Sequence, residues 1–193
     1  MEQELKNVVY SRDSIEFVTV AVQYCGFIES FEEDSMIELT DKLTKLLPLL
    51  YLKASLIPQT EMDGEEDVET IVTEEDYNYI LSRMYRVFGK DDAYLEVFLE
   101  DMKYSETPIT ESVSENLADI YQDLKNFITV YERGVTEHMN DALYVCTENF
   151  KTYWGQKLVN VLGALHSIKY SDLVDDIDAE EDVQDMDMEE NIW

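Results

Sequence analysis

Histidine and cysteine, the side chains that most often bind metals or act as nucleophiles, are scarce here, with two of each in 193 residues. His138 and His166 lie on one predicted helix, about 42 Å apart at 1.5 Å per residue, so they cannot share an ion within one chain. Cys25 and Cys146 form no CxxC or other ligand spacing, and both fall on apolar faces, where a free thiol behaves as a small hydrophobe. The sequence therefore assigns no catalytic residue, no metal ligand and no cofactor.

Acidic residues offer a second kind of chemistry. The stretch SENLADIYQDLKNF resembles the acidic helix of MazG-like all-α nucleotide pyrophosphatases, which hold magnesium with acidic pairs on two facing helices. The resemblance implies metal-binding roles for Glu115 and Asp119, which here are four residues apart where the family pattern has three. The residues that could supply the partner pair, at the end of an earlier helix, are Glu29, Glu32 and Glu33.

The geometry of that helix favours another interpretation. Glu115, Asp119 and Asp123 fall within about 80° of one another around the helix axis, and the centre of the apolar stripe lies about 140° away. These acids are therefore expected to form a solvated face. A magnesium-dependent nucleotide pyrophosphatase of the MazG-like class is kept as the alternative hypothesis.

A third candidate site lies in the most apolar stretch, Ile15 to Ile28. Its polar residues Glu16, Thr19 and Gln23 follow one another at helical spacing and draw a thin line down an otherwise apolar helix. They could line a pocket within a bundle, or they could be a narrow exposed edge. Alternating β-branched residues also permit a strand, but the polar spacing and the N-cap candidate Ser11 favour a helix.

Other signatures are missing from the sequence. No glycine-rich phosphate loop occurs, and nothing marks a nucleophile of a Ser-His-Asp or Cys-His arrangement. The acidic segment around Gly64 lacks the alternating oxygen ligands and the terminal glutamate of an EF-hand calcium loop.

Charge restricts the partners of this chain. It carries 44 acidic and 14 basic residues, a net charge of -30. Such a field repels nucleic acids and anionic membranes and attracts basic proteins, so we expect a protein partner with a basic face. No signal peptide or membrane-spanning run is present, and the cysteines indicate no disulfide framework, which predicts a cytoplasmic protein of unknown oligomeric state.

Apolar periodicity and capping residues predict six helices. Four begin at Ser11, Ser35, Thr73 and Ser112, and the long last one is expected to begin at Thr136. Pro48 is expected to kink or split the second helix, and a short helix is predicted over residues 91–102. Gly89 and Gly134 are expected to end the helices before them, and the last two stripes predict an antiparallel αα-hairpin.

Two acid-only segments interrupt this pattern and hold more than half of the net charge. Residues 58–72 form an acidic loop within the domain of residues 1–170, and residues 171–193 form an acidic C-terminal tail with eleven acids and no base. Acidic and apolar residues interleaved in this way are typical of a segment that orders on binding a partner, although the tail could also only solubilise the chain or fold on its own body. The tail residues expected to bind are Leu173, Val174, Ile177, Met186, Met188 and Trp193.

The stretches SRDSIEFVTVAVQYCGFIE and ENLADIYQDLKNFI, with their spacing, resemble a family of uncharacterised proteins from anaerobic gut bacteria that is classed as a domain of unknown function. The resemblance covers most of residues 8–170 and implies an all-helical cytoplasmic domain without a known active site. We therefore expect a single all-α domain, a bundle of five to seven helices. The leading hypothesis for its function is a non-enzymatic interaction or adaptor protein that recognises a partner through the tail or an acidic face.

Overall fold

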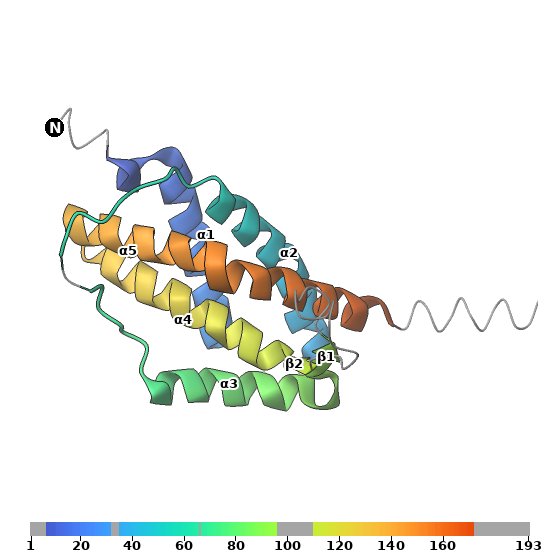
Figure 1. Ribbon diagram of the computed structural model, residues 1–193. Helices are drawn as coiled ribbons and strands as arrows, with labels where there is room; N and C mark the ends of the chain where they lie inside the picture. The colour runs from blue at the N-terminus through green and yellow to red at the C-terminus, as the bar shows by residue number, and fades with distance from the viewer. Residues whose placement is uncertain (1–6, 32–34, 66, 96–109, 172–193) are drawn as a thin grey trace, which may run out of the picture.

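The computed structural model describes residues 7–31, 35–65, 67–95 and 110–171, which form one helical bundle with a short two-stranded sheet at one end (Figure 1). The helices of this part of the chain are α1 (Arg12–Ser30), α2 (Met36–Ser55), α3 (Glu74–Phe88), α4 (Val113–Glu132) and α5 (Thr136–Asn149). Single 3₁₀ turns cover Val8–Tyr10 and Gly89–Asp91. The expected all-α, single-domain bundle is confirmed.

Local side-chain chemistry fixes most helix starts. Ser11, Ser35, Thr73 and Ser112 each accept a hydrogen bond from the backbone N–H three residues further on, which satisfies one of the unpaired donors of a first turn. These four predicted caps are confirmed. Thr136 is not a cap: α5 begins after Val135 without a side-chain bond, and the Thr136 hydroxyl instead lies 2.8 Å from the Tyr10 hydroxyl.

The prediction of a helix over residues 91–102 is wrong for residues 93–95, which the structure describes. Ala93–Leu95 forms strand β1, which pairs antiparallel with β2 (Thr110–Ser112). The preceding Asp92 is buried, and its carboxylate accepts hydrogen bonds from the Ser114 N–H at 2.8 Å and the Ser112 hydroxyl at 2.6 Å. The chain at Asp92 is thus tied to the start of α4, and strand pairing replaces the next helical turn. Residues 96–102 lie outside the described residues.

Helix α4 is the central element. It contacts α1, α3 and α5, and Figure 1 shows α3 on one side of it and α5 on the other. Its apolar stripe is buried, and Phe127 stacks on Phe17 of α1 with ring centroids 5.4 Å apart. Helix α1 is less enclosed than its composition suggests, because Ile15 and Val22 are half exposed.

Pro48 lies inside α2, which nevertheless runs as a single helix from Met36 to Ser55. The last helix is long, as predicted, but not uniform: α5 passes through a π-helical turn, Phe150–Trp154, into a helical segment over residues 155–171. Within the turn Trp154 is buried, and its indole N–H donates to the Cys146 carbonyl at 3.0 Å. Cys25 and Cys146 are buried free thiols, and burial raises the pKa of both, so they are inert core residues.

Candidate functional site

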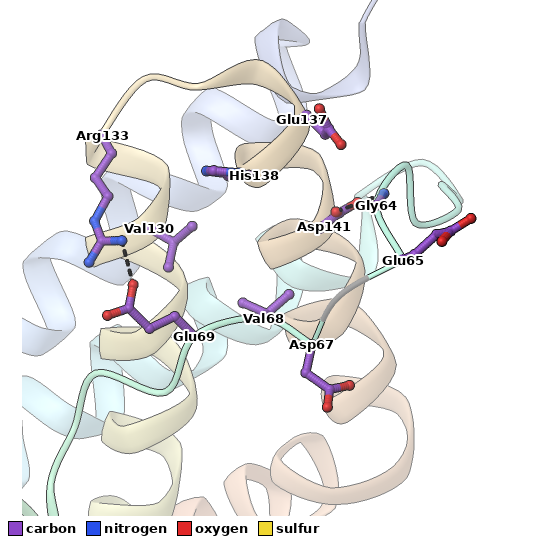
Figure 2. A pocket seen from close by; sticks show the side chains of 10 residues that line it. All are labelled: Gly64, Glu65, Asp67, Val68, Glu69, Val130, Arg133, Glu137, His138 and Asp141. Carbon is purple, nitrogen blue, oxygen red and sulfur yellow. Dashed lines mark hydrogen bonds and ion pairs between the residues drawn. The ribbon is translucent and has the colours of Figure 1, made fainter.

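A cavity of about 430 Å³ opens between residues 64, 65 and 67–69 and the turn that joins α4 to α5. We call residues 60–65 and 67–72 the acidic strap and this hollow the acidic cavity. Figure 2 shows Glu65 and Asp67 on the strap and Asp141 beside Gly64, with α4 and α5 behind. The lining residues are Gly64, Glu65, Asp67, Val68, Glu69, Val130, Arg133, Glu137, His138 and Asp141.

Two buried polar residues of α5 hold the first half of the strap. The Thr60 hydroxyl donates to Asn140 Oδ1, and Asn140 Nδ2 donates to the Glu61 carbonyl, both at 2.7 Å. The carboxylate of Asp141, which is 5% exposed, accepts the backbone N–H groups of Asp63 at 2.6 Å and Gly64 at 3.0 Å. Because a buried carboxylate is costly without donors, these two N–H groups are the reason that Asp141 can lie inside.

Gly64 lets the strap approach Asp141 this closely. A Cβ added at Gly64 would lie 2.7 Å from Asp141 Oδ2, well inside van der Waals contact. The single glycine of the acidic segment therefore serves packing against α5.

The second half of the strap is tied to α4. Asn126 Oδ1 accepts both the Ile71 and Val72 N–H groups at 2.8 Å, and the Val72 side chain is buried. Arg133 pairs with Glu69. The hydrogen bond from Arg133, and then the attraction of its positive charge, lower the pKa of Glu69. The expected solvated loop is thus irregular in conformation but held at both ends by bundle side chains.

The charge of the acidic cavity is strongly negative. Its lining includes five carboxyl residues against one arginine, and the strap residues Glu61, Asp63, Glu65, Asp67 and Glu69 are all exposed. No group of three or more His, Cys, Asp or Glu within the described ranges has an arrangement that could hold a metal ion. The chemistry available here is attraction of cationic groups such as lysine and arginine side chains.

The acids of α4 are placed differently from the expected solvated face. Glu115 is exposed, but the Asp119 side chain is 13% exposed and accepts the hydroxyls of Tyr77 and Tyr153, both at 2.8 Å. Lys157 Nζ lies 2.9 Å from Asp119 Oδ2. The interpretation was wrong for Asp119 because α4 is central, so that α3 and the last helix cover the side opposite its apolar stripe.

Asp123 is also turned toward a neighbouring helix. It accepts a hydrogen bond from Asn149 Nδ2 at 2.5 Å, and burial raises the pKa of its carboxyl group. Burial, followed by the hydrogen bond to the Asp119 carboxylate, likewise raises the pKa values of Tyr77 and Tyr153. The acids of α4 therefore belong to a polar layer between helices.

The predicted pocket line lies on the outer side of α1. Glu16 pairs with Lys53 at 2.6 Å and Arg12 at 2.7 Å, which lowers its pKa, and Thr19 and Gln23 are exposed. The Thr19 hydroxyl donates to the carbonyl of Ile15 one turn earlier. The three residues line neither the acidic cavity nor the groove described below.

The remaining residues named from the sequence are the tail residues and the two histidines. The tail residues Leu173, Val174, Ile177, Met186, Met188 and Trp193 lie outside the described residues. Both histidines are exposed, and His138 lines the acidic cavity. Within the described segments no helix is long and apolar enough to cross a membrane.

The residues that sequence reasoning missed are the strap anchors Asn126, Asn140 and Asp141. A signal existed for two of them. Asn140 and Asp141 stand between the core positions Met139 and Leu143, next to the apolar stripe of α5, where a polar pair needs buried partners.

Comparisons with known proteins agree with this architecture. The family described as a domain of unknown function, DUF5063, matches residues 8–171. The crystal structure of protein BF1032 from Bacteroides fragilis is 43% identical, covers 86% of this chain and 97% of its own, and superposes with a TM-score of 0.73. The search of curated proteins found no match. The expected resemblance to an uncharacterised bacterial family is thereby confirmed.

Proposed function

The chain belongs to the DUF5063 family, and we propose that within it this protein is a non-enzymatic interaction or adaptor protein that binds a basic segment of a partner through the acidic strap. The observation that carries the proposal is that a buried carboxylate of α5 and a half-buried amide of α4 fix the backbone of an exposed acidic segment. A flexible acidic loop would need no such anchors to keep the protein in solution.

Anchoring favours binding for an energetic reason. A loop that is already ordered loses less conformational entropy when a partner docks, so more of the electrostatic attraction appears as affinity. The exposed carboxylates also steer a basic partner toward the strap and raise its association rate at low ionic strength. The expected partner segment is rich in lysine and arginine and needs no deep apolar pocket.

A basic peptide of about 15 residues, labelled for fluorescence anisotropy, tests whether the strap is the binding surface. Two substitutions on the strap, Glu65→Gln and Asp67→Asn, are compared with Glu38→Gln and Glu115→Gln, which remove the same charge from exposed positions at the starts of α2 and α4. The strap variant is expected to raise the Kd about tenfold at low salt, and the control pair by less than threefold. Equal weakening by both pairs would assign binding to net charge and reject the strap.

The partner itself is sought by capture from the host lysate with the full chain and mass spectrometry. Baits carrying the strap substitutions, and a chain ending at Tyr170, separate recognition through the strap from recognition through the tail. A specific protein that is lost with the strap charges supports the proposal, whereas one lost only with the tail moves recognition to residues 171–193.

The alternative is a magnesium-dependent nucleotide pyrophosphatase of the MazG-like class. One observation favours it: Asp119 and Asp123 face neighbouring helices. Against it, the Asp119 carboxylate is already held by two tyrosine hydroxyls and the Lys157 ammonium group. Turnover of nucleoside triphosphates with magnesium that disappears in Asp119→Ala and survives in Glu132→Ala, an exposed acid at the end of α4, would support this function instead.

A further inference from the structure

A second and larger hollow, about 1170 Å³, is lined in part by strand β1. Figure 1 shows the strands at the end of the bundle away from the α4–α5 turn. We call this hollow the end groove. It is formed by the first turns of α2, by residues 90–95 with strand β1, and by the last helix from Val159 to Ser171. It shares no lining residue with the acidic cavity.

The end groove exposes large apolar side chains. Ile37 is 81% exposed and Leu95 is 58% exposed, and Val159 adds a third apolar side chain from the opposite wall. Single exposed apolar residues are ordinary, but several gathered around one concave surface mark a place where another chain segment packs.

A buried hydroxyl in the groove lacks a partner. Thr40 is 1% exposed, and its Oγ1 is the side-chain atom that the described residues leave buried without a hydrogen bond. Thr19, Thr129 and Thr147 in the other helices donate to the carbonyl four residues earlier. Because a buried hydroxyl without a partner is costly, Thr40 indicates that an acceptor from outside the described residues enters the groove.

The charge of the groove differs from that of the chain. Its lining holds Lys90 and Lys169 against the single acid Asp91, while the whole chain has a net charge of -30. Lys169 Nζ also lies 3.0 Å from Asp41, at the edge of the same region. An apolar hollow with two ammonium groups suits a segment that mixes acidic and apolar residues.

We propose that the occupant of the end groove is residues 172–193 of the same chain, with their first apolar residues packed on Ile37, Leu95 and Val159 and their acids toward Lys90 and Lys169. Ser171 lines the groove, so this segment starts at its edge. The helical wall from Val159 to Ser171 is about 18 Å long, which an extended chain spans in about six residues and a helix in about twelve. Leu173, Val174 and Ile177 fall within that reach.

Covalent attachment makes this docking effective even when the contact is weak. A segment tethered at the edge of its own site has an effective concentration of about a millimolar or more. The tail would then be docked in the end groove of its own bundle. A partner that binds the tail would have to displace the tail from this groove. This proposal is independent of the acidic strap, which lies at the other end of the bundle.

Thiol labelling of the full chain tests the docking directly. The native Cys25 and Cys146 are buried, so the variant Ile37→Cys introduces one accessible thiol in the groove. Its labelling rate is compared with that of the same variant carrying Leu173→Ser, Val174→Ser and Ile177→Ser. Val22→Cys on α1, half exposed and outside the groove, is the matched control.

The expected result is at least a tenfold faster labelling of Ile37→Cys when the three tail residues are changed, with no change for Val22→Cys. In the full chain, Lys90→Glu is expected to accelerate labelling as well, whereas Lys151→Glu, outside the groove, is not. Circular dichroism confirms that each variant keeps its helices.

Three results would overturn the proposal. Equal and fast labelling with and without the tail substitutions means that the groove is open. Equal and slow labelling means that something other than the tail covers it, such as residues 96–109. Protection that weakens on dilution means that the tail of a second copy, and not of the same chain, occupies the groove.

Discussion

The two ends of the bundle differ in how their polar and apolar side chains are satisfied by the rest of the chain. At the α4–α5 end, the buried Asn140 and Asp141 and the half-buried Asn126 are satisfied by backbone groups of the strap. At the strand end, Thr40 is buried without a partner and Ile37 is exposed. The first end is complete within the described residues, whereas the second leaves a hydroxyl unpaired and large apolar side chains exposed.

This difference has a consequence for function. A surface whose backbone is fixed and whose charges face outward is ready to meet a partner without rearrangement. A surface with exposed apolar residues and an unsatisfied hydroxyl is stabilised by whatever covers it. This difference is why we propose recognition of a basic partner at the first end and docking of the tail at the second.

The largest effect is expected at the complete end. Asp141→Ala removes the acceptor of the Asp63 and Gly64 N–H groups, so we expect a loss of about 3 kcal/mol in the free energy of unfolding, measured with urea. Hydrogen exchange of residues 61–69 should accelerate in the same variant. Glu137→Ala, one turn earlier and exposed, should change stability by less than about 0.5 kcal/mol. A small effect of Asp141→Ala would mean that the strap is not anchored by α5.

A smaller loss of stability is expected when a methyl group is added at the contact between Gly64 and Asp141. Gly64→Ala brings a Cβ to 2.7 Å from Asp141 Oδ2, and moving either group weakens the anchor, so we expect a loss of about 2 kcal/mol. In Gly26→Ala, where a Cβ meets nothing within 4 Å inside helix α1, alanine should stabilise the protein by about 0.5–1 kcal/mol. If both substitutions stabilise, the strap does not lie on α5 in solution.

At the strand end of the bundle we expect a substitution that increases the free energy of unfolding. In a chain that also carries Leu173→Ser, Val174→Ser and Ile177→Ser, Thr40→Val removes a buried hydroxyl that has no partner and should stabilise the protein by about 1 kcal/mol, measured with urea. Thr147→Val, which removes a hydroxyl bonded to the Leu143 carbonyl at 2.9 Å, should destabilise it by a similar amount. With the native tail, docking supplies an acceptor to the Thr40 hydroxyl, so this gain should be lost. A gain of the same size in both backgrounds would show that the tail does not reach Thr40.

What the sequence predicts well is local. The caps at Ser11, Ser35, Thr73 and Ser112 depend on bonds over three residues, and the apolar stripe of α4 depends on a periodicity within one helix. These features need no knowledge of the rest of the chain.

What it did not predict depends on distant partners. Asp63 meets Asp141, and Ala93 pairs with Ser112, so neither the anchored strap nor strand β1 follows from neighbouring residues. The apolar stripe of α4 marks one buried side of the helix, and this stripe alone predicts that Asp119 faces solvent. A central helix buries a second side, and the polar residues there are satisfied by groups such as Tyr77 and Tyr153 from other helices.

The smallest expected effect concerns two surface ion pairs, Glu69–Arg133 on the strap and Asp41–Lys169 beside the end groove. Hydrogen bonds from basic side chains lower the pKa of Glu69, through Arg133, and of Asp41, through Lys45 and Lys169. A carboxyl whose pKa is lowered by folding adds stability above its unfolded pKa, and this contribution is lost as the pH falls through the lowered folded value.

The stability advantage of the native protein over Glu69→Gln and over Asp41→Asn should therefore be present at pH 7 and disappear as the pH falls below about 4, the range of ordinary carboxyl pKa values. Urea midpoints between pH 7 and pH 3 measure it. Both pairs reach solvent, the Glu69–Arg133 pair more than the Asp41–Lys169 pair, so added salt should weaken both effects. If the tail packs beside Lys169, however, its acids share that ammonium group. The stability effect of Asp41→Asn should then respond to salt less in the native chain than in the chain whose Leu173, Val174 and Ile177 are changed to serine. A salt response identical to that of Glu69→Gln, with or without the tail substitutions, would count against an acidic segment in the end groove.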